Sequence, residues 1–259
     1  MSTLLFDEIV YGPVKSRRLG ISLGINLSPV NGKRCTFNCI YCECGLNEER
    51  RTKTPAPSRE KVRQALTGKL AEMNTEGVCP DVITFSGNGE PTMHPDFAGI
   101  IDDTLEIRDK LCPGTKVAVL SNSTMLHKEE VMQALCKADE NLMKLDAVSD
   151  DLIGQIDQPE MHDFTAEKVV EQLCRFNGKL IIQTIFLKGE HNGVCIDNTC
   201  DGNVAQWIEA LKKIRPEKVM IYTINRETPV KTLQKTPVET LEQIAEKVRQ
   251  AGFDVSVST

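Results

Sequence analysis

Short apolar runs alternate along the chain with longer stretches whose apolar residues recur every three or four positions. A run of about 4–8 apolar residues is typical of a buried strand, whereas a spacing of roughly 3.6 is typical of an amphipathic helix. Strands are therefore predicted over Gly20–Leu27, Asp81–Ser86, Lys116–Ser121, Leu142–Val148, Lys179–Leu187 and Lys218–Ile224, with a further strand-like run at Phe253–Ser258.

Helical stripes lie between these runs. The last stripe has a start signal, because Thr236 can cap a helix, Pro237 suits a first turn and Glu239 completes a capping box. The stripes cover Val62–Met73, Phe97–Leu105, Val131–Ala138, Val204–Ile214 and Val238–Val248.

This alternation of strands and helices implies parallel strands joined by right-handed crossovers. Six units are too few for a closed eight-stranded barrel. We predict an α/β fold, an open, partial TIM-like (β/α)6 barrel of parallel strands, in a single domain over residues 1–259. A cysteine-rich loop covers about 28–54, and the C-terminal helix and strand cover about 237–258. In such a barrel the chemistry belongs at the carboxyl ends of the strands.

The composition narrows the class of protein. A formal net charge of −6 gives no general attraction to a nucleic-acid backbone. The chain has no run of eighteen apolar residues, and its N-terminus carries acids where a signal peptide has basic residues, so we expect a cytoplasmic protein without a membrane partner. The 10 cysteines of such a protein indicate metal ligands and buried thiols rather than disulfides.

The densest chemical signal is a group of three cysteines in the loop after the first strand. Three residues separate Cys35 from Cys39, and two separate Cys39 from Cys42. Three thiolates can bind three irons of a cubane, whereas ordinary [4Fe–4S] electron carriers use four cysteines. An open position on a metal serves to bind a substrate, as in catalytic zinc sites. The spacing therefore predicts a [4Fe–4S] cluster with one open iron.

Two alternatives give these cysteines another role. Cys44 would complete a structural zinc site, although zinc ligands usually come as two separated pairs rather than four residues within one short stretch. Cys44 would equally complete a four-ligand cluster, which makes the protein a redox sensor or an electron carrier.

The cysteine spacing, with Tyr41 directly before the third cysteine, resembles the signature of the radical S-adenosylmethionine (SAM) superfamily. The stretch Tyr11–Gly20, continued through Leu23–Asn26 and Cys39–Cys44, is similar to small radical SAM proteins related to the wyosine-base (tRNA-modifying) enzymes. The resemblance implies an oxygen-sensitive oxidoreductase in which SAM chelates the open iron. Reductive cleavage of SAM gives a 5′-deoxyadenosyl radical, which abstracts hydrogen from a substrate. It also implies an external electron donor of the flavodoxin or ferredoxin type.

Two strand ends agree with this resemblance. Gly87–Glu90 follows the second strand and resembles the superfamily's GGE motif, which binds the SAM amino group, with Asn88 in place of the second glycine. Ser121 and Asn122 end the third strand and resemble a Thr-Asn-Gly strand end. A plain turn and a loop cap are the structural alternatives, because Gly, Ser and Asn favour such positions in any protein.

The next strands add buried polar groups. Lys144 and Asp146 share one face of a strand, and opposite charges there are costly unless they pair or meet a ligand. Gln183 is the one amide in an apolar strand, and a structural ion pair or a core glutamine is the alternative. The expected SAM-binding residues are Tyr41, Gly87, Asn88, Gly89, Glu90, Ser121, Asn122, Lys144, Asp146 and Gln183, with no catalytic residue assigned beyond the cluster.

The remaining cysteines give weaker evidence of a functional role. Cys79, Cys112, Cys136 and Cys174 read as small core residues. Cys195 and Cys200 share a polar loop with His191, which leaves a second metal site open as an alternative.

The substrate is the least defined part. The resemblance to wyosine enzymes suggests an RNA base, which the acidic charge does not favour. A glycyl-radical-enzyme activase and a small-molecule enzyme are the alternatives. His94 could line the substrate pocket, and Arg17 or Arg18 could reach an anionic substrate.

Overall fold

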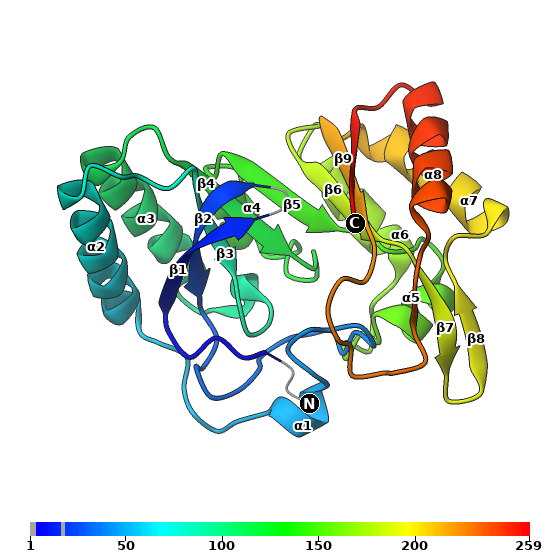
Figure 1. Cartoon of the computed structure of the whole chain (residues 1–259), viewed down its shortest axis with the longest axis horizontal. Coiled ribbons are helices and arrows are strands. Elements are labelled where there is room, and N and C mark those ends of the chain that lie inside the picture. Colours follow the sequence, from blue (N-terminus) through cyan, green and yellow to red (C-terminus); the bar gives the residue numbers. More distant parts are fainter. Residues whose placement is uncertain (1–3, 17–18) are drawn as a thin grey trace.

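The computed structural model describes residues 4–16 and 19–259. One sheet curls into an open half-barrel with helices packed on its outer side (Figure 1). The strand order is β1-β2-β3-β4-β5-β6-β9-β11, and every neighbouring pair is parallel except β1 with β2. The strands are β1 Val10–Ser16, β2 Gly20–Asn26, β3 Val82–Ser86, β4 Lys116–Ser121, β5 Glu140–Lys144, β6 Ile181–Ile185, β9 Lys218–Tyr222 and β11 Val255–Ser258.

This architecture confirms the predicted α/β half-barrel. The six predicted strands are β2, β3, β4, β5, β6 and β9, and the C-terminal run adds β11 at the edge. Several predicted boundaries are wrong by two residues or more, and β9, for example, ends at Tyr222 rather than Ile224. β5 ends at Lys144 rather than Val148, and Leu187 begins a separate strand rather than ending β6.

The sequence pattern missed one edge strand and a small second sheet. β1 carries Pro13 and several polar residues, which hide its strand pattern. The second sheet has the order β10-β7-β8, with β7 Leu187–His191, β8 Val194–Asp197 and β10 Gln234–Lys235. Asn192 and Gly193, both with positive φ, form the turn between β7 and β8. An Asn-Gly pair is a strong hairpin signal, so the sequence did contain the information.

The helices are α1 Asn47–Arg50, α2 Arg59–Thr75, α3 Phe97–Leu111, α4 Glu129–Leu135, α5 Asp150–Ile156, α6 Ala166–Cys174, α7 Asp201–Ile214 and α8 Val238–Gln250, with a 3-10 turn at Pro91–Met93. Six of them, α2, α3, α4, α6, α7 and α8, pack on the outer face of the sheet, whereas α1 lies in the cysteine loop, below the sheet in Figure 1. No helix within the described ranges is long and apolar enough to cross a membrane.

The predicted capping box of α8 is wrong. Pro237 is the N-cap residue, and no side chain caps the helix. The Thr236 hydroxyl instead donates to the Phe186 carbonyl at 2.8 Å, and the Thr236 N–H donates to the Thr223 hydroxyl at 2.7 Å. These bonds join the segment before α8 to the ends of β6 and β9.

The two faces of the sheet bury different residues. The outer face packs under the helices, with edge-to-face contacts such as Phe85 with Phe97. The inner face carries a separate apolar layer, which we call the inner floor. Its buried residues are Val82, Ala118, Leu142, Ile181 and Met220.

The prediction that the cysteines form no disulfide is wrong. Cys79 and Cys112 are bonded, with their Cα atoms 5.8 Å apart. α3 ends where the loop before β3 passes, so residues distant in sequence become neighbours. Cys136 is exposed rather than in the core, because it is the C-cap of α4 and not on its buried stripe. Cys174 is partly buried against the main core.

Candidate active site

The turn after β3 fixes the cysteine loop against the sheet. Arg34 N–H donates to the Asn88 carbonyl at 3.0 Å, and Glu90 N–H donates to the Arg34 carbonyl at 2.9 Å. Gly89 has φ of +137°, and a Cβ at this position would lie 1.8 Å from the Arg34 carbonyl oxygen. Only glycine permits this close approach. The glycine-rich turn and the cysteine loop therefore form one unit.

A pocket of about 290 Å³ opens at the carboxyl ends of the strands. It lies between the cysteine loop and the segment after β9, which run side by side below the sheet in Figure 1. The predicted site residues that line it are Cys35, Cys39, Tyr41, Cys42, Gly89, Glu90, Ser121, Asn122, Lys144 and Gln183. The structure thus brings together ten residues from five separate segments of the sequence.

Asn88 lies behind this pocket. Its side chain is fully buried, its oxygen accepts from Phe6 N–H at 2.8 Å, and its amide donates to the Phe6 carbonyl at 2.8 Å and the Pro29 carbonyl at 3.1 Å. Gly87 packs against Asn26. Neither residue is among the described residues that line the pocket. Their observed contacts position the turn.

Glu90 is buried where the turn meets β4. Its carboxylate accepts from Thr92 N–H at 3.0 Å, from the Ser121 hydroxyl at 2.9 Å and from Asn122 N–H at 2.7 Å. Burial raises the pKa of this carboxyl, and these hydrogen bonds oppose that rise. Glu90 therefore holds the two strand ends together while one side of it faces the pocket.

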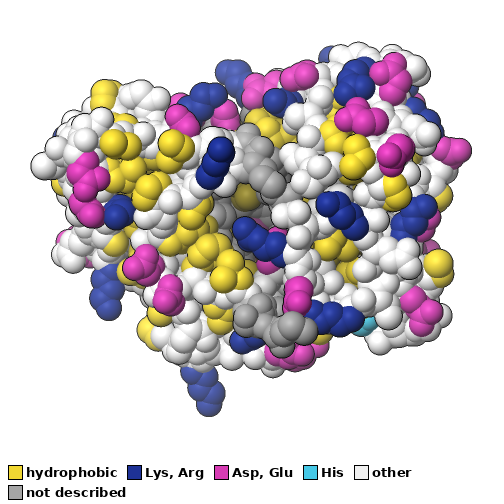
Figure 2. All heavy atoms as spheres, in the orientation of Figure 1, with side chains coloured by type: hydrophobic (Ala, Val, Ile, Leu, Met, Phe, Trp, Pro, Cys, Tyr) yellow, Lys and Arg dark blue, Asp and Glu magenta, His cyan; other side chains and the backbone are white. Residues whose placement is uncertain are grey.

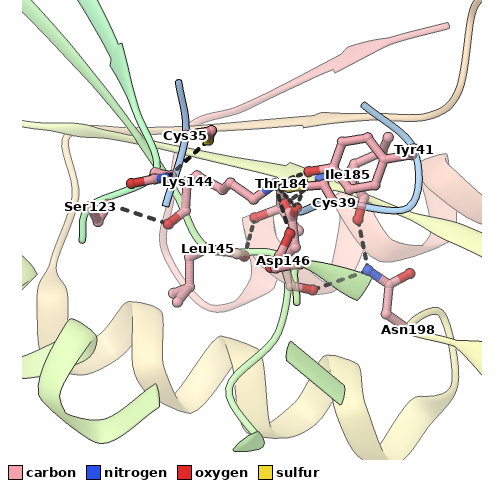
Figure 3. Close-up of polar contacts among 12 residues, drawn as sticks. Cys35, Cys39, Tyr41, Ser123, Lys144, Leu145, Asp146, Thr184, Ile185 and Asn198 are labelled. Carbon is pink, nitrogen blue, oxygen red and sulfur yellow. Dashed lines mark hydrogen bonds and ion pairs between the residues drawn. The ribbon is translucent and has the colours of Figure 1, made fainter. Parts of the chain in front are cut away.

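Lys144 is the centre of a buried polar group on the pocket wall (Figure 3). Its ammonium nitrogen lies 2.8 Å from Asp146 Oδ2 and 2.8 Å from Asp157 Oδ1. It also lies 3.3 Å from Cys39 Sγ and contacts the Tyr41 hydroxyl, which donates to Asp146. Asp146 does not line the pocket itself and acts on it through Lys144 and Tyr41.

The charges in this group are coupled. Burial lowers the pKa of Lys144, but Asp146 and Asp157 outweigh it and hold that pKa well above its usual value. Burial raises the pKa of Asp157 to about 7, against the opposing effect of Lys144. Lys144 is thus a charged ammonium group whose two carboxylate partners are both in the protein.

The cysteines differ in their surroundings. Burial raises the pKa of Cys35 to about 12 and that of Cys39 well above its usual value. The pKa of Cys42 falls to about 5, first because the Cys44 thiol donates a hydrogen bond to it and also because Lys33 is close. Cys44 is buried and contacts the Gly87 carbonyl at 3.5 Å. Three free thiols on one loop, with ammonium groups beside them, fit an anionic iron–sulfur cluster.

Lys33 is the second ammonium group near the thiols. It is 2% exposed, and its nitrogen donates to the Gly45 carbonyl at 2.8 Å. Burial lowers its pKa, but the attraction of Cys42, Cys35 and Cys39 outweighs this, so the pKa is raised. Lys33 is not among the described residues that line the pocket.

Several site residues were missed from the sequence. Asp157 is the C-cap of α5 and reaches Lys144 only because the chain folds back over the cysteine loop. The segment after β9 lines the pocket mouth, where Arg226 pairs with Glu43 at 2.5 Å. No local pattern marks either feature, since both depend on long-range packing.

The other residues that the sequence suggested for a site lie outside this pocket. His94 bonds to the Pro57 carbonyl at 2.8 Å and lines a different pocket, beside Arg59. Cys195 is exposed on β8, and Cys200 is the N-cap of α7. Arg17 and Arg18 lie outside the described residues.

Comparison with protein families gives a match to the radical SAM superfamily over residues 32–191. The chain belongs to the radical SAM superfamily. It is an S-adenosylmethionine-dependent enzyme of unknown substrate, and the family implies an iron–sulfur cluster and SAM. A UPF0026 protein of Helicobacter pylori is 31% identical over 238 residues, which are 90% of this chain and 72% of that protein. One from Synechocystis is 32% identical over 236 residues, covering 87% of this chain and 78% of that protein.

Solved structures share the fold. Streptococcus suis SuiB bound to S-adenosylmethionine has a TM-score of 0.65 and 14% identity, covering 91% of this chain and 50% of SuiB. TYW1 with a lysine-pyruvate adduct bound has a TM-score of 0.61 and 16% identity, covering 88% of this chain and 73% of TYW1. The chain spans only half the length of SuiB. The predicted resemblance to radical SAM proteins, with the wyosine enzyme TYW1 among the structural neighbours, is confirmed.

Proposed function

We propose that this protein reductively cleaves SAM at a [4Fe–4S] cluster held by Cys35, Cys39 and Cys42. When bound, the cluster would supply one electron to the sulfonium of SAM, whose bond to C5′ would break to give methionine and a 5′-deoxyadenosyl radical. That radical would take a hydrogen atom from the substrate and become 5′-deoxyadenosine. The electron comes from an external flavodoxin or ferredoxin type of donor.

The convergence of strand ends on the three thiols carries this proposal. An electron carrier needs no pocket beside its cluster, whereas this chain has one lined by polar groups from four parallel strands. In our proposal Gly89, Glu90 and Asn122 orient the amino-acid part of SAM. Lys144, with Asp146 and Tyr41 behind it, and Gln183 provide polar contacts to the rest, while Gly87 and Asn88 position the turn.

Product formation tests the proposal. Anaerobically reconstituted protein given dithionite and SAM should form 5′-deoxyadenosine, measured by chromatography, and Cys→Ala at any of the three positions should abolish it. Cys136→Ala, an exposed cysteine remote from the pocket, is the control and should leave product and iron content unchanged. Wild-type protein with a confirmed cubane cluster that forms no product would contradict the proposal.

Substitution of Cys44 distinguishes this proposed function from that of an electron carrier. Cys44→Ala should keep the cluster, because three ligands suffice. Loss of the cluster in Cys44→Ala, with Glu90→Ala unaffected, would instead indicate a four-ligand carrier.

Within the enzyme class, an RNA base is one candidate substrate. On the face shown in Figure 2, Lys and Arg side chains are interspersed with Asp and Glu and form no continuous basic area. A backbone-binding surface needs such an area. Retention of tRNA at physiological salt would support an RNA substrate, and no retention would favour a small molecule or a glycyl-radical enzyme.

A further inference from the structure

The two buried lysines beside the cysteines differ in their partners. Lys144 lies 2.8 Å from Asp146, which Figure 3 shows, and 2.8 Å from Asp157, so its charge already has acidic partners in the protein. Lys33 forms no ion pair with an Asp or Glu of residues 4–16 or 19–259. Its ammonium nitrogen donates a hydrogen bond at 2.8 Å to a neutral group, the Gly45 carbonyl.

An ammonium group at 2% exposure is costly to bury without an anion. The Gly45 N–H donates in turn to the Cys42 carbonyl at 2.9 Å, so the Lys33 ammonium group lies beside the turn that carries Cys42. Cys42 is one of the proposed cluster ligands, and another, Cys35, is two residues from Lys33 in the sequence. A cubane in its oxidised form carries one net negative charge with three thiolates, and reduction adds a second. A bound cluster would therefore place its net negative charge beside this buried ammonium group.

The position of Lys33 excludes a role in holding SAM. Its side chain lies by the carbonyl of Gly45, within the cysteine loop, and it is not among the described residues that line the pocket. Its charge therefore acts on the cluster and not on the ligand in the pocket. A cation in a low-dielectric site favours the more negative of two oxidation states.

We propose that Lys33 is the internal counter-ion of the iron–sulfur cluster and stabilises its reduced state. This inference rests on the proposed function, because it requires the cluster at the three cysteines. Lys33 is a positioning residue for electron transfer: it makes the one-electron reduction of the cluster by the external donor more favourable.

The test is an EPR-monitored redox titration of the anaerobically reconstituted full chain, with iron per chain measured first. Lys33→Met keeps the length of the side chain and removes its charge. At a fixed potential its ratio of reduced to oxidised cluster should fall at least about tenfold, which is about 59 mV for a one-electron couple. Lys33→Arg should stay near wild type. Lys53→Met, an exposed lysine of the same loop, should have no effect.

The outcomes separate the two proposals. A wild-type chain that binds no EPR-active cluster overturns the proposed function itself. If Lys33→Met carries a full cluster whose reduction potential equals that of wild type, only the proposal that Lys33 is a counter-ion is overturned. If Lys33→Met does not load, loading by Lys33→Arg supports the requirement for charge, and failure of both variants shows a packing role and contradicts the proposal.

Discussion

The inner face of the sheet is apolar at the amino ends of its strands and polar at their carboxyl ends. On β5 Leu142 belongs to the inner floor, and Lys144, two residues later on the same face, lines the pocket. On β6 Ile181 is followed in the same way by Gln183. One strand thus supplies both a stabilising layer and a reactive wall. Burial of the apolar end stabilises the folded state, whereas the polar end has to bury charged groups, which costs free energy.

Lys144→Met tests the polar end and should have the largest effect on stability. It leaves Asp146 and Asp157 buried without their cation, which should cost about 4 kcal/mol of unfolding free energy. Denaturant unfolding of the metal-free protein measures this. Lys116→Met, at the exposed amino end of β4, removes an ion pair with Glu140 and should cost under about 1 kcal/mol. Equal losses of unfolding free energy in Lys144→Met and Lys116→Met would show that burial of the charges at the polar end has no special effect on stability.

Leu142→Ala tests the apolar end. The side chain is fully buried in the inner floor, so its truncation should cost about 3 kcal/mol. Val78→Ala, at a side chain that is 46% exposed, is the control and should change stability by less than about 0.5 kcal/mol. A small loss for Leu142→Ala would mean that the floor contributes little.

The sequence predicted the strands and most of the pocket because both depend on local patterns. A strand shows as an apolar run, and Glu90, Asn122 and Lys144 follow or end such runs. Asp157 and the disulfide between Cys79 and Cys112 could not be predicted, since each depends on segments brought together only by packing. Asn88 was expected to bind SAM, but a local motif cannot show that its side chain faces Phe6.

Outside the barrel, Asp103 lies on α3 and joins it to α2. Arg59 donates two hydrogen bonds to it at 2.7 and 2.8 Å, and Arg63 donates one at 2.8 Å, so its pKa is lowered. Asp103→Asn should cost about 1 kcal/mol at neutral pH. Because the pKa is lower in the folded state, this stability is present above the unfolded pKa of about 3.9 and is lost as pH falls through the folded value.

The measurement is urea unfolding of Asp103→Asn and wild type at several pH values. The difference should be constant from neutral pH down to about pH 5 and shrink below that. Asp102→Asn, whose carboxylate pairs with Lys137 at the surface, is the control and should show a smaller difference. If the difference in unfolding free energy between wild type and Asp103→Asn grew on acidification, the predicted direction of the pH dependence would be wrong.

Gly68→Ala should have the smallest effect, and a favourable one. Gly68 lies inside α2, and a Cβ there meets nothing within 4 Å. Alanine should therefore stabilise the helix by about 0.5–1 kcal/mol. The same change at Gly89 would collide with the Arg34 carbonyl, so thermal unfolding should separate the two variants in opposite directions.

The proposed function requires one iron of the cluster to lack a protein ligand so that SAM can bind it. Mössbauer spectroscopy of ⁵⁷Fe-reconstituted protein, recorded with and without SAM, tests this most directly. SAM should change the signal of one iron site of the cubane and leave the signals of the other three unchanged. A spectrum that is the same with and without saturating SAM, in protein with a full cluster, would contradict it.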